Sequence, residues 1–181
     1  MVPDKLSLQQ LGPTIGTSMM PQKLIDYLLA DSKQAVDDFS ENLVGKIDKQ
    51  LEVTLDDESS EYFMACAKTM LKHSTRDTFK DVYISAAWHN IMTQEWEHNP
   101  IHWHGSCQLS SVGYLELPTS EDKGRIEFHP GGGYPNTPIH IDPVVGMFMM
   151  WPWHLQHSVA PIKGITGARR SFSINIKGTL V

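Results

Sequence analysis

The feature that most constrains the fold is a series of short strand-like segments that begins near residue 81. Each segment is rich in β-branched or aromatic residues, and Gly- or Pro-containing breaks separate one from the next. In order they read DVYISAAWHNIM, IHWHG, QLSSVGYLEL, GRIEFH, VVGMFMMWP and RRSFSINIKG. Because no helical periodicity intervenes, the series predicts an antiparallel sandwich or barrel rather than a parallel α/β sheet.

The N-terminal part of the chain has a different pattern. Residues 1–20 contain several Pro and Gly residues with little periodicity, which predicts an irregular segment. Helical spacing of apolar residues starts after Pro21, and a second helical stretch is expected over about 32–43. A third helix is expected to begin near Asp56, because consecutive acidic residues favour a helix N-terminus. Its apolar stripe comprises Phe63, Ala67, Met70 and Leu71.

These patterns predict one α+β domain over residues 1–181 with a mainly β core. A length of 181 residues suits a single domain with a substantial core. We expect a helical N-terminal part over residues 1–80 and a double-sheet core over residues 81–181, with the helices packed on one sheet.

Charge, cysteine content and hydropathy exclude several classes of partner, site and location. The formal net charge of −6 argues against affinity for phosphate backbones, so we expect no nucleic-acid partner. Cys66 and Cys107 are not in a CxxC pair, which predicts buried thiols rather than a disulfide or a zinc–thiolate site. We find neither a long apolar run nor a signal-peptide pattern, and so expect no membrane span and a cytoplasmic location.

Histidines are concentrated in the second half of the chain, where eight of the nine lie between His89 and His157. In a strand, His102 and His104 would point to the same side and could share one metal ion if a third ligand came from another strand. His157 follows a buried strand and a turn, so it is the candidate third ligand. His154, in the turn itself, is expected to be a turn or surface residue.

The last strand segment has one polar and one apolar face. By alternation Arg169, Ser171, Ser173 and Asn175 share a face, opposite Phe172 and its apolar neighbours. A polar face inside a barrel indicates a ligand pocket. An arginine with a hydroxyl two residues further on suits a carboxylate, because the guanidinium binds it in bidentate fashion and the hydroxyl adds a hydrogen bond.

Taken in order, these segments resemble the superfamily of 2-oxoglutarate- and Fe(II)-dependent oxygenases. The resemblance is closest to a bacterial and phage branch that is distantly similar to prolyl hydroxylases. It spans about residues 82–176 and is carried by NPIHWHG, QLSSVGYLELP, GRIEF, IDPVVGMFMMWPWHLQHSVAP and RRSFSINI. It implies a double-stranded β-helix, or jelly roll, and a hydroxylase that uses O2 and releases succinate and CO2 while oxidising a substrate that the motifs do not define.

The resemblance also implies a set of site residues. Fe(II) would be held by His102, by the residue two positions on, and by His157. 2-Oxoglutarate would chelate the iron and place its far carboxylate on Arg169 and Ser171. The hydroxyl of Tyr114 would face the same cavity, and ascorbate would keep the iron reduced. The Gly- and Pro-rich segment 129–140 would form either a lid or a surface loop.

The chain departs from the usual motif at one position. The superfamily typically has His-x-Asp/Glu and a distant His, whereas here His104 stands at the carboxylate position. Two alternatives therefore stay open. One is a cupin-type iron dioxygenase with three His ligands and no need for 2-oxoglutarate. The other is a jelly-roll protein with a binding or structural role and no catalysis.

Overall fold

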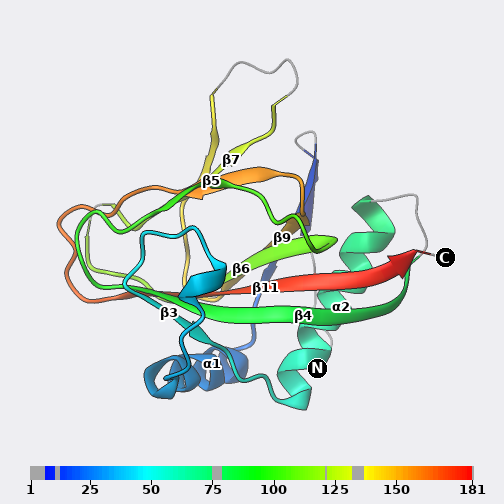
Figure 1. Ribbon diagram of the computed structural model, residues 1–181, viewed down its shortest axis with the longest axis horizontal. Helices are drawn as coiled ribbons and strands as arrows, with labels where there is room; N and C mark the ends of the chain where they lie inside the picture. The colour runs from blue at the N-terminus through cyan, green and yellow to red at the C-terminus, as the bar shows by residue number, and fades with distance from the viewer. Residues whose placement is uncertain (1–6, 11–12, 75–78, 121, 132–136, 181) are drawn as a thin grey trace.

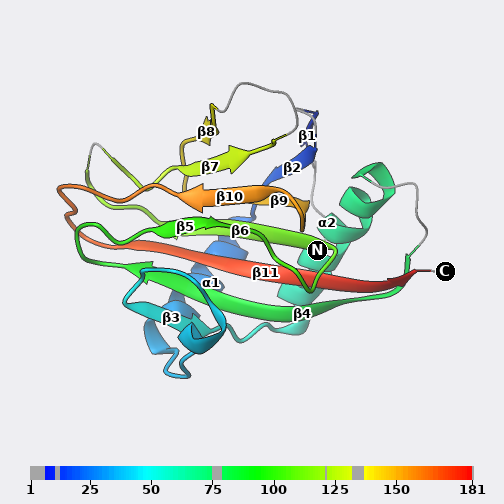
Figure 2. The same ribbon diagram turned by 45° about the horizontal axis from the view of Figure 1, so that its top comes forward.

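The computed structural model describes residues 7–10, 13–74, 79–120, 122–131 and 137–180. Its strands form two antiparallel sheets that face each other, as Figures 1 and 2 show. The large sheet has the strand order β1-β2-β9-β6-β11-β4-β3, and the small sheet has the order β5-β10-β7-β8. The elements are β1 (Ser7–Gln10), β2 (Thr14–Met19), α1 (Gln22–Gln34), the 3-10 turn η1 (Ser40–Asn42), β3 (Lys49–Glu52), α2 (Asp57–Ser74), β4 (Phe79–Met92), β5 (Asn99–His102), β6 (Leu109–Glu116), β7 (Ile126–His129), β8 (Ile139–Ile141), β9 (Met147–Pro152), β10 (Gln156–Val159) and β11 (Arg169–Leu180).

This architecture confirms the expected jelly roll with helices on one sheet. Helices α1 and α2 cover the outer face of the large sheet, and the small sheet covers its inner face (Figure 1). The helix predicted near Asp56 is α2, and the four residues of its apolar stripe are all buried. Within the described residues, no helix has the length and apolar character needed to cross a membrane.

Alternation along β11 separates two cores. Phe172, Ile174 and Ile176 point outward into the cluster formed with both helices. Arg169 and Ser171 point inward, into the space between the sheets. The neighbouring strands β6 and β9 alternate in the same way, so Val112 and Met149 belong to the inner core while Leu115 and Phe148 belong to the outer one.

Gly113 makes room for an aromatic ring at the centre of the outer core. It lies opposite Phe172 in the β6–β11 pair. A Cβ at position 113 would lie 2.3 Å from Phe172 Cε1 and Cζ, far inside van der Waals contact. Because the Phe172 ring is fully buried and packs on Phe63 and Phe148, it has no free space into which to move.

The N-terminal part contains the helices α1 and α2, but it also contains three strands that were not expected, two of them within residues 1–20, which were expected to be irregular. Strands β1 and β2 extend the large sheet beside β9, and β3 closes its other edge beside β4. Strands β2 and β3 pair with distant segments and carry little local periodicity, with Ile15 as a buried apolar residue of β2. The small sheet also contains β8, which starts at Ile139, at the end of the segment 129–140 that was expected to be a lid or loop.

The helix expected over residues 32–43 is also wrong beyond Gln34. Ala35 adopts an extended ψ of 135°, which ends α1. The chain then runs beside β3, where the Phe39 amide donates to the Gln50 carbonyl oxygen. Asp38 accepts hydrogen bonds from the backbone N–H and the hydroxyl of Ser40, and so competes with helix formation.

A buried polar contact attaches α1 to the large sheet. His89 on β4 is fully buried, and its Nε2 lies 2.8 Å from Asp31 Oδ2 on α1. Burial lowers the pKa of His89 below its ordinary value, and the carboxylate of Asp31 opposes this shift only in part. The imidazole is therefore neutral at neutral pH and donates its Nε2–H to the carboxylate.

We expect Gly113→Ala to destabilise the protein by about 2 kcal/mol, because the new methyl group overpacks the Phe172 site. Urea unfolding followed by circular dichroism measures the change. Gly105→Ala is the matched control, since a Cβ at position 105 meets no atom within 4 Å. Equal stability of the two variants would contradict the packing argument.

The pH dependence of stability should reflect His89. The pKa of His89 is lower in the folded than in the unfolded protein. The contribution of neutral His89 to the free energy of unfolding is therefore fully present above about pH 6.5 and is lost as the pH falls from there toward the folded pKa. We expect the loss of unfolding free energy between pH 7.5 and pH 5.5 to be smaller in His89→Gln than in the wild type. An equal loss in the two proteins would contradict this role of His89.

Candidate metal centre

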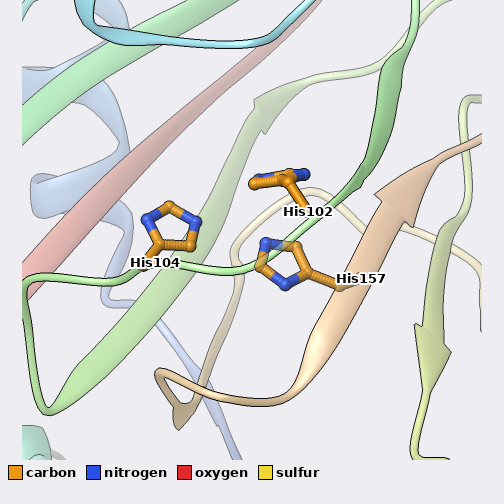
Figure 3. A group of neighbouring side chains, drawn as sticks. All are labelled: His102, His104 and His157. Atoms are coloured by element: carbon orange, nitrogen blue, oxygen red, sulfur yellow. The ribbon is translucent and has the colours of Figure 1, made fainter.

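Three histidine side chains converge at the open end of the small sheet. His102 is the last residue of β5, His104 follows two residues later, and His157 lies opposite His102 on β10. One ring nitrogen from each residue lies within 4.8 Å of the others. The ring centroids are 4.3 Å apart for His102 and His157, 5.1 Å for His102 and His104, and 5.2 Å for His104 and His157. Figure 3 shows the three rings turned toward one another.

Backbone carbonyls fix the orientation of two of these rings. His102 Nδ1 lies 2.7 Å from the Pro100 carbonyl oxygen, and His157 Nδ1 lies 3.0 Å from that of Leu155. A carbonyl oxygen only accepts, so both Nδ1 atoms carry the proton and both Nε2 atoms keep a free lone pair. This is the arrangement by which proteins set the tautomer of metal-binding histidines.

Burial keeps all three imidazoles neutral. It lowers the pKa of His102, lowers that of His157 well below the ordinary value, and lowers that of His104 to about 4. The mutual repulsion that protonated neighbours would feel acts in the same direction for His104 and His157. The side chain of Asn175 opposes the shift at His104. Neutral imidazole is the form that binds Fe(II) and other transition metals.

No carboxylate joins this cluster among the residues that the structure describes. The position that the usual motif gives to Asp or Glu is occupied by the His104 side chain, whose ring also stacks on Trp88 at 5.9 Å. An ion held here by the three histidines alone would keep its full positive charge, whereas a carboxylate ligand would cancel one unit of it.

A cavity extends inward from the three histidines between the two sheets. This inner cavity is small, with a volume of about 30 Å³, and Arg169 and Ser171 line it on the side of the large sheet. The side chain of Arg169 is 1% exposed. Its Nη1 donates to Ser171 Oγ at 2.8 Å, while Nε and Nη2 have no hydrogen-bond partner.

The state of Arg169 is energetically unusual. Within the described ranges it makes no ion pair, although a buried, unpaired charge costs several kcal/mol. Burial lowers its pKa, but an arginine stays protonated at neutral pH. A guanidinium with two unsatisfied donors on the wall of a cavity has the chemistry to bind an anion.

Tyr114 lies beside this guanidinium. Its ring centroid is 5.2 Å from Arg169 Cζ, and its fully buried hydroxyl has no partner of good hydrogen-bonding geometry. Burial raises the pKa of Tyr114, so the hydroxyl is protonated. Tyr114 is not among the side chains that line the inner cavity, so it reaches the anion receptor only through its contact with Arg169.

Sequence reasoning missed several polar groups of the inner cavity. Asn99 Oδ1, Ser110 Oγ and Trp151 Nε1 are buried without partners and belong to residues that line it. The sequence could have indicated Ser110, because this polar residue shares the inward face of its strand with Val112 and Tyr114. Asn99 has no such signal, since its position depends on how β5 pairs with β10.

A second, open cleft lies on the other side of the histidines. This outer cleft has a volume of about 490 Å³ and is walled by the segment 39–44, by β4 and by the loop 103–106. His102, His104, Asn99 and Trp88 line both spaces, whereas His157 lines the inner cavity. His102 and His104 therefore stand between a small buried cavity and a wide cleft that opens to solvent.

The remaining candidate residues lie apart from the cluster. His154 is exposed in the turn between β9 and β10, as expected from the sequence. Trp103, between His102 and His104 in the sequence, is 56% exposed and forms part of the outer-cleft wall. Of the segment 129–140 expected to be a lid or loop, residues 132–136 lie outside the described residues.

Comparison with known proteins identifies the family of this site. Residues 86–175 match a family model described as "Putative 2OG-Fe(II) oxygenase". This region contains the three histidines as well as Arg169 and Ser171. A search of curated proteins found no match.

Several solved structures share the fold at low sequence identity. A prolyl-4-hydroxylase from Pseudomonas putida is 13% identical over 92% of this chain and 93% of its own, with a TM-score of 0.64. The viral collagen prolyl hydroxylase of Paramecium Bursaria Chlorella virus-1, in complex with 2OG, is 13% identical over 90% and 94%, with a TM-score of 0.63. HygX from Streptomyces hygroscopicus, with nickel, 2-oxoglutarate and hygromycin B bound, is 9% identical over 91% and 83%, with a TM-score of 0.63.

The family match and the shared jelly roll agree with the resemblance seen in the sequence. The family uses Fe(II) and 2-oxoglutarate, and the residues present suit both groups: three neutral imidazoles for the metal and an unpaired buried guanidinium for the dianion. The chain belongs to the superfamily of 2-oxoglutarate- and Fe(II)-dependent oxygenases.

Proposed function

We propose that this protein is a hydroxylase in which His102, His104 and His157 hold Fe(II) and Arg169 binds 2-oxoglutarate. The far carboxylate of the cosubstrate accepts hydrogen bonds from the Arg169 guanidinium and from the Ser171 hydroxyl. Bound Fe(II) supplies the redox chemistry that couples decarboxylation of 2-oxoglutarate, to succinate and CO2, with transfer of one oxygen atom of O2 to a substrate carbon. Ascorbate would keep the iron reduced.

The observation that carries this proposal is the unpaired Arg169 at the wall of the inner cavity. Its free Nε and Nη2 donors can bind one carboxylate in bidentate fashion, and this ion pair would offset the cost of burying the charge. Ser171 already holds the guanidinium in place through Nη1. The residues therefore fit a small dicarboxylate that spans the space from Arg169 to the histidines.

The chain's own contribution is to bind, orient and exclude water. The carbonyls of Pro100 and Leu155 keep the Nε2 lone pairs of His102 and His157 directed at the metal position. The unpaired polar atoms of Ser110 and Trp151 offer further hydrogen bonds to a ligand in the inner cavity. Tyr114 supports the guanidinium by contact with its ring, as a positioning residue. A substrate would approach from the outer cleft, on the opposite side of the metal position.

A second candidate function follows from the absence of a carboxylate near the histidines in the described part of the chain. A cupin-type dioxygenase with three His ligands would need no keto acid, and Arg169 would then bind a carboxylate of the substrate itself. The two functions differ in whether 2-oxoglutarate binds to the metal-loaded protein.

We expect Arg169→Met to weaken binding of 2-oxoglutarate at least about 100-fold, because the bidentate ion pair is lost. Calorimetric titration of the anaerobic Fe(II)-loaded protein measures this affinity. The variant without ligand should be as stable as the wild type or more so, because an unpaired buried charge is removed. Arg170→Met is the matched control, since Arg170 points outward and pairs with Glu116 at 3.0 Å. Failure of the wild type to bind 2-oxoglutarate would leave the three-His dioxygenase as the better assignment.

Removal of single histidines tests the metal assignment. We expect His157→Ala and His104→Ala each to weaken Fe(II) binding about 100-fold or more. A loss of this size exceeds that expected when a group that only orients a metal ligand is removed. Anaerobic titration with Fe(II) measures the affinity. His154→Ala, the same change in the adjacent turn, should bind as the wild type does. Unchanged affinity in His104→Ala would show that two histidines suffice and that His104 is not a ligand.

A further inference from the structure

We propose that the outer cleft selects a substrate that carries a cationic group, an ammonium or a guanidinium, and that Glu52 and Trp103 recognise it. The proposal rests on the proposed function, because it names the substrate class of the same site. It derives from the charge of the cleft wall, the direction of the Glu52 side chain and the aromatic rings beside it.

The charge on the cleft wall has one sign. Among the described residues that line the outer cleft, Glu52 is the only one with a carboxylate, and none is Lys or Arg. The adjoining segment that contains Phe39 also carries the exposed acids Asp37, Asp38 and Glu41. The carboxylates at this end of the cleft favour a cation over an anion there, whereas a metal ion held by the histidines would add positive charge at the other end of the cleft.

The strand register directs Glu52 into the cleft. Glu52 lies directly opposite Trp88 in the antiparallel pair of β3 and β4, so their side chains lie on the same face of the large sheet. Two residues earlier, Gln50 Nε2 donates to Asn90 Oδ1 at 2.8 Å on that face, which confirms the facing of this stretch of β3. The structure gives the Glu52 carboxylate no ion pair and no hydrogen bond in the described ranges, so it is free to bind a ligand.

Aromatic rings complete the recognition surface. Phe39 stacks on Trp88 at 5.4 Å and 11°, and Trp88 stacks on His104 at 5.9 Å and 25°. Trp88 is already packed between neighbours, whereas Trp103 is 56% exposed and offers an open ring in the same cleft. A cation over an indole ring gains both the quadrupole attraction and contact area with its aliphatic stem.

The same contacts set the spacing between the cationic group and the reacting carbon. Cβ atoms of directly opposed residues lie about 5 Å apart in an antiparallel pair, which places Glu52 beside Trp88. Trp88 in turn stacks on His104. One side chain, that of Trp88, thus lies between the Glu52 carboxylate and His104. A substrate whose charged group binds Glu52 would need a flexible stem of several carbons to place its reacting carbon at the metal.

The experiment uses capped tripeptides, Gly-X-Gly, in which X is lysine, arginine, norleucine or glutamate. Binding to the full-length protein loaded with Zn(II), a diamagnetic ion that leaves the indole NMR signals sharp, is followed by those signals. The Trp103 signal is assigned with Trp103→Phe. We expect the lysine or arginine peptide to bind at least about fivefold more tightly than norleucine, the isosteric neutral residue. This preference should weaken at high salt, as expected for a partly exposed ion pair.

Glu52→Gln tests the residue itself. We expect Glu52→Gln to abolish the preference for the cationic peptide over the norleucine peptide. We expect Trp103→Ala to weaken the binding of the cationic peptide relative to the wild type. Glu41→Gln is the matched control, with the same chemical change at an exposed acid outside the cleft lining, and should keep most of the preference. The proposal is overturned if norleucine binds as tightly as lysine and arginine, if neither cationic peptide binds, or if Glu52→Gln keeps the preference. Titration of the same samples with 2-oxoglutarate separates this failure from a failure of the proposed function.

Discussion

The two-faced character of β11 is the constraint on which the rest of the structure depends. The strand lies between β6 and β4 in the large sheet, and each residue along it belongs to one of two environments. Phe172 and its apolar partners hold the helices on the outside, while Arg169 and Ser171 line the cavity on the inside. A shift of register by one residue would bury the polar side chains under the helices and fill the cavity with apolar ones. The packing of α2 on Phe172 therefore also positions the anion receptor.

Arg169 shows how this fold holds a destabilising group at its centre. A buried guanidinium without a carboxylate costs several kcal/mol, and the apolar packing on the opposite face of the same strand is large enough to tolerate that cost. Because Gly124 approaches the Arg169 side chain so closely that a Cβ would lie 3.1 Å from its Cδ and Nε, the guanidinium has little freedom to turn away. On the proposed function, this charge is held in place for 2-oxoglutarate, and it does not add to the stability of the unliganded protein.

Patterns within single segments of the sequence predict the faces of β11 and the position of α2. Alternation in β11 predicts the faces of Arg169 and Phe172, and consecutive acids with an apolar stripe predict α2. Strands β2 and β3 could not be predicted, because β9 and β4, with which they pair, lie far away in the sequence and their own residues are mixed. The outer cleft includes Glu52, the last residue of β3. Sequence reasoning thus found the three histidines and Arg169 but did not identify the acid across the cleft.

On the proposed assignments the two sides of the metal position carry opposite charge. Three neutral imidazoles leave the doubly charged ion uncompensated, and the permanent charge on the inner-cavity wall, Arg169, is also positive. The inner cavity therefore attracts a dianion more strongly than a centre with a carboxylate ligand would, and it repels a cation until that dianion has bound. The outer cleft has Glu52 as its charged residue and attracts the cation from the solvent side. Electrostatics alone then favours binding of 2-oxoglutarate before the substrate, an order that keeps the metal chelated when the substrate arrives.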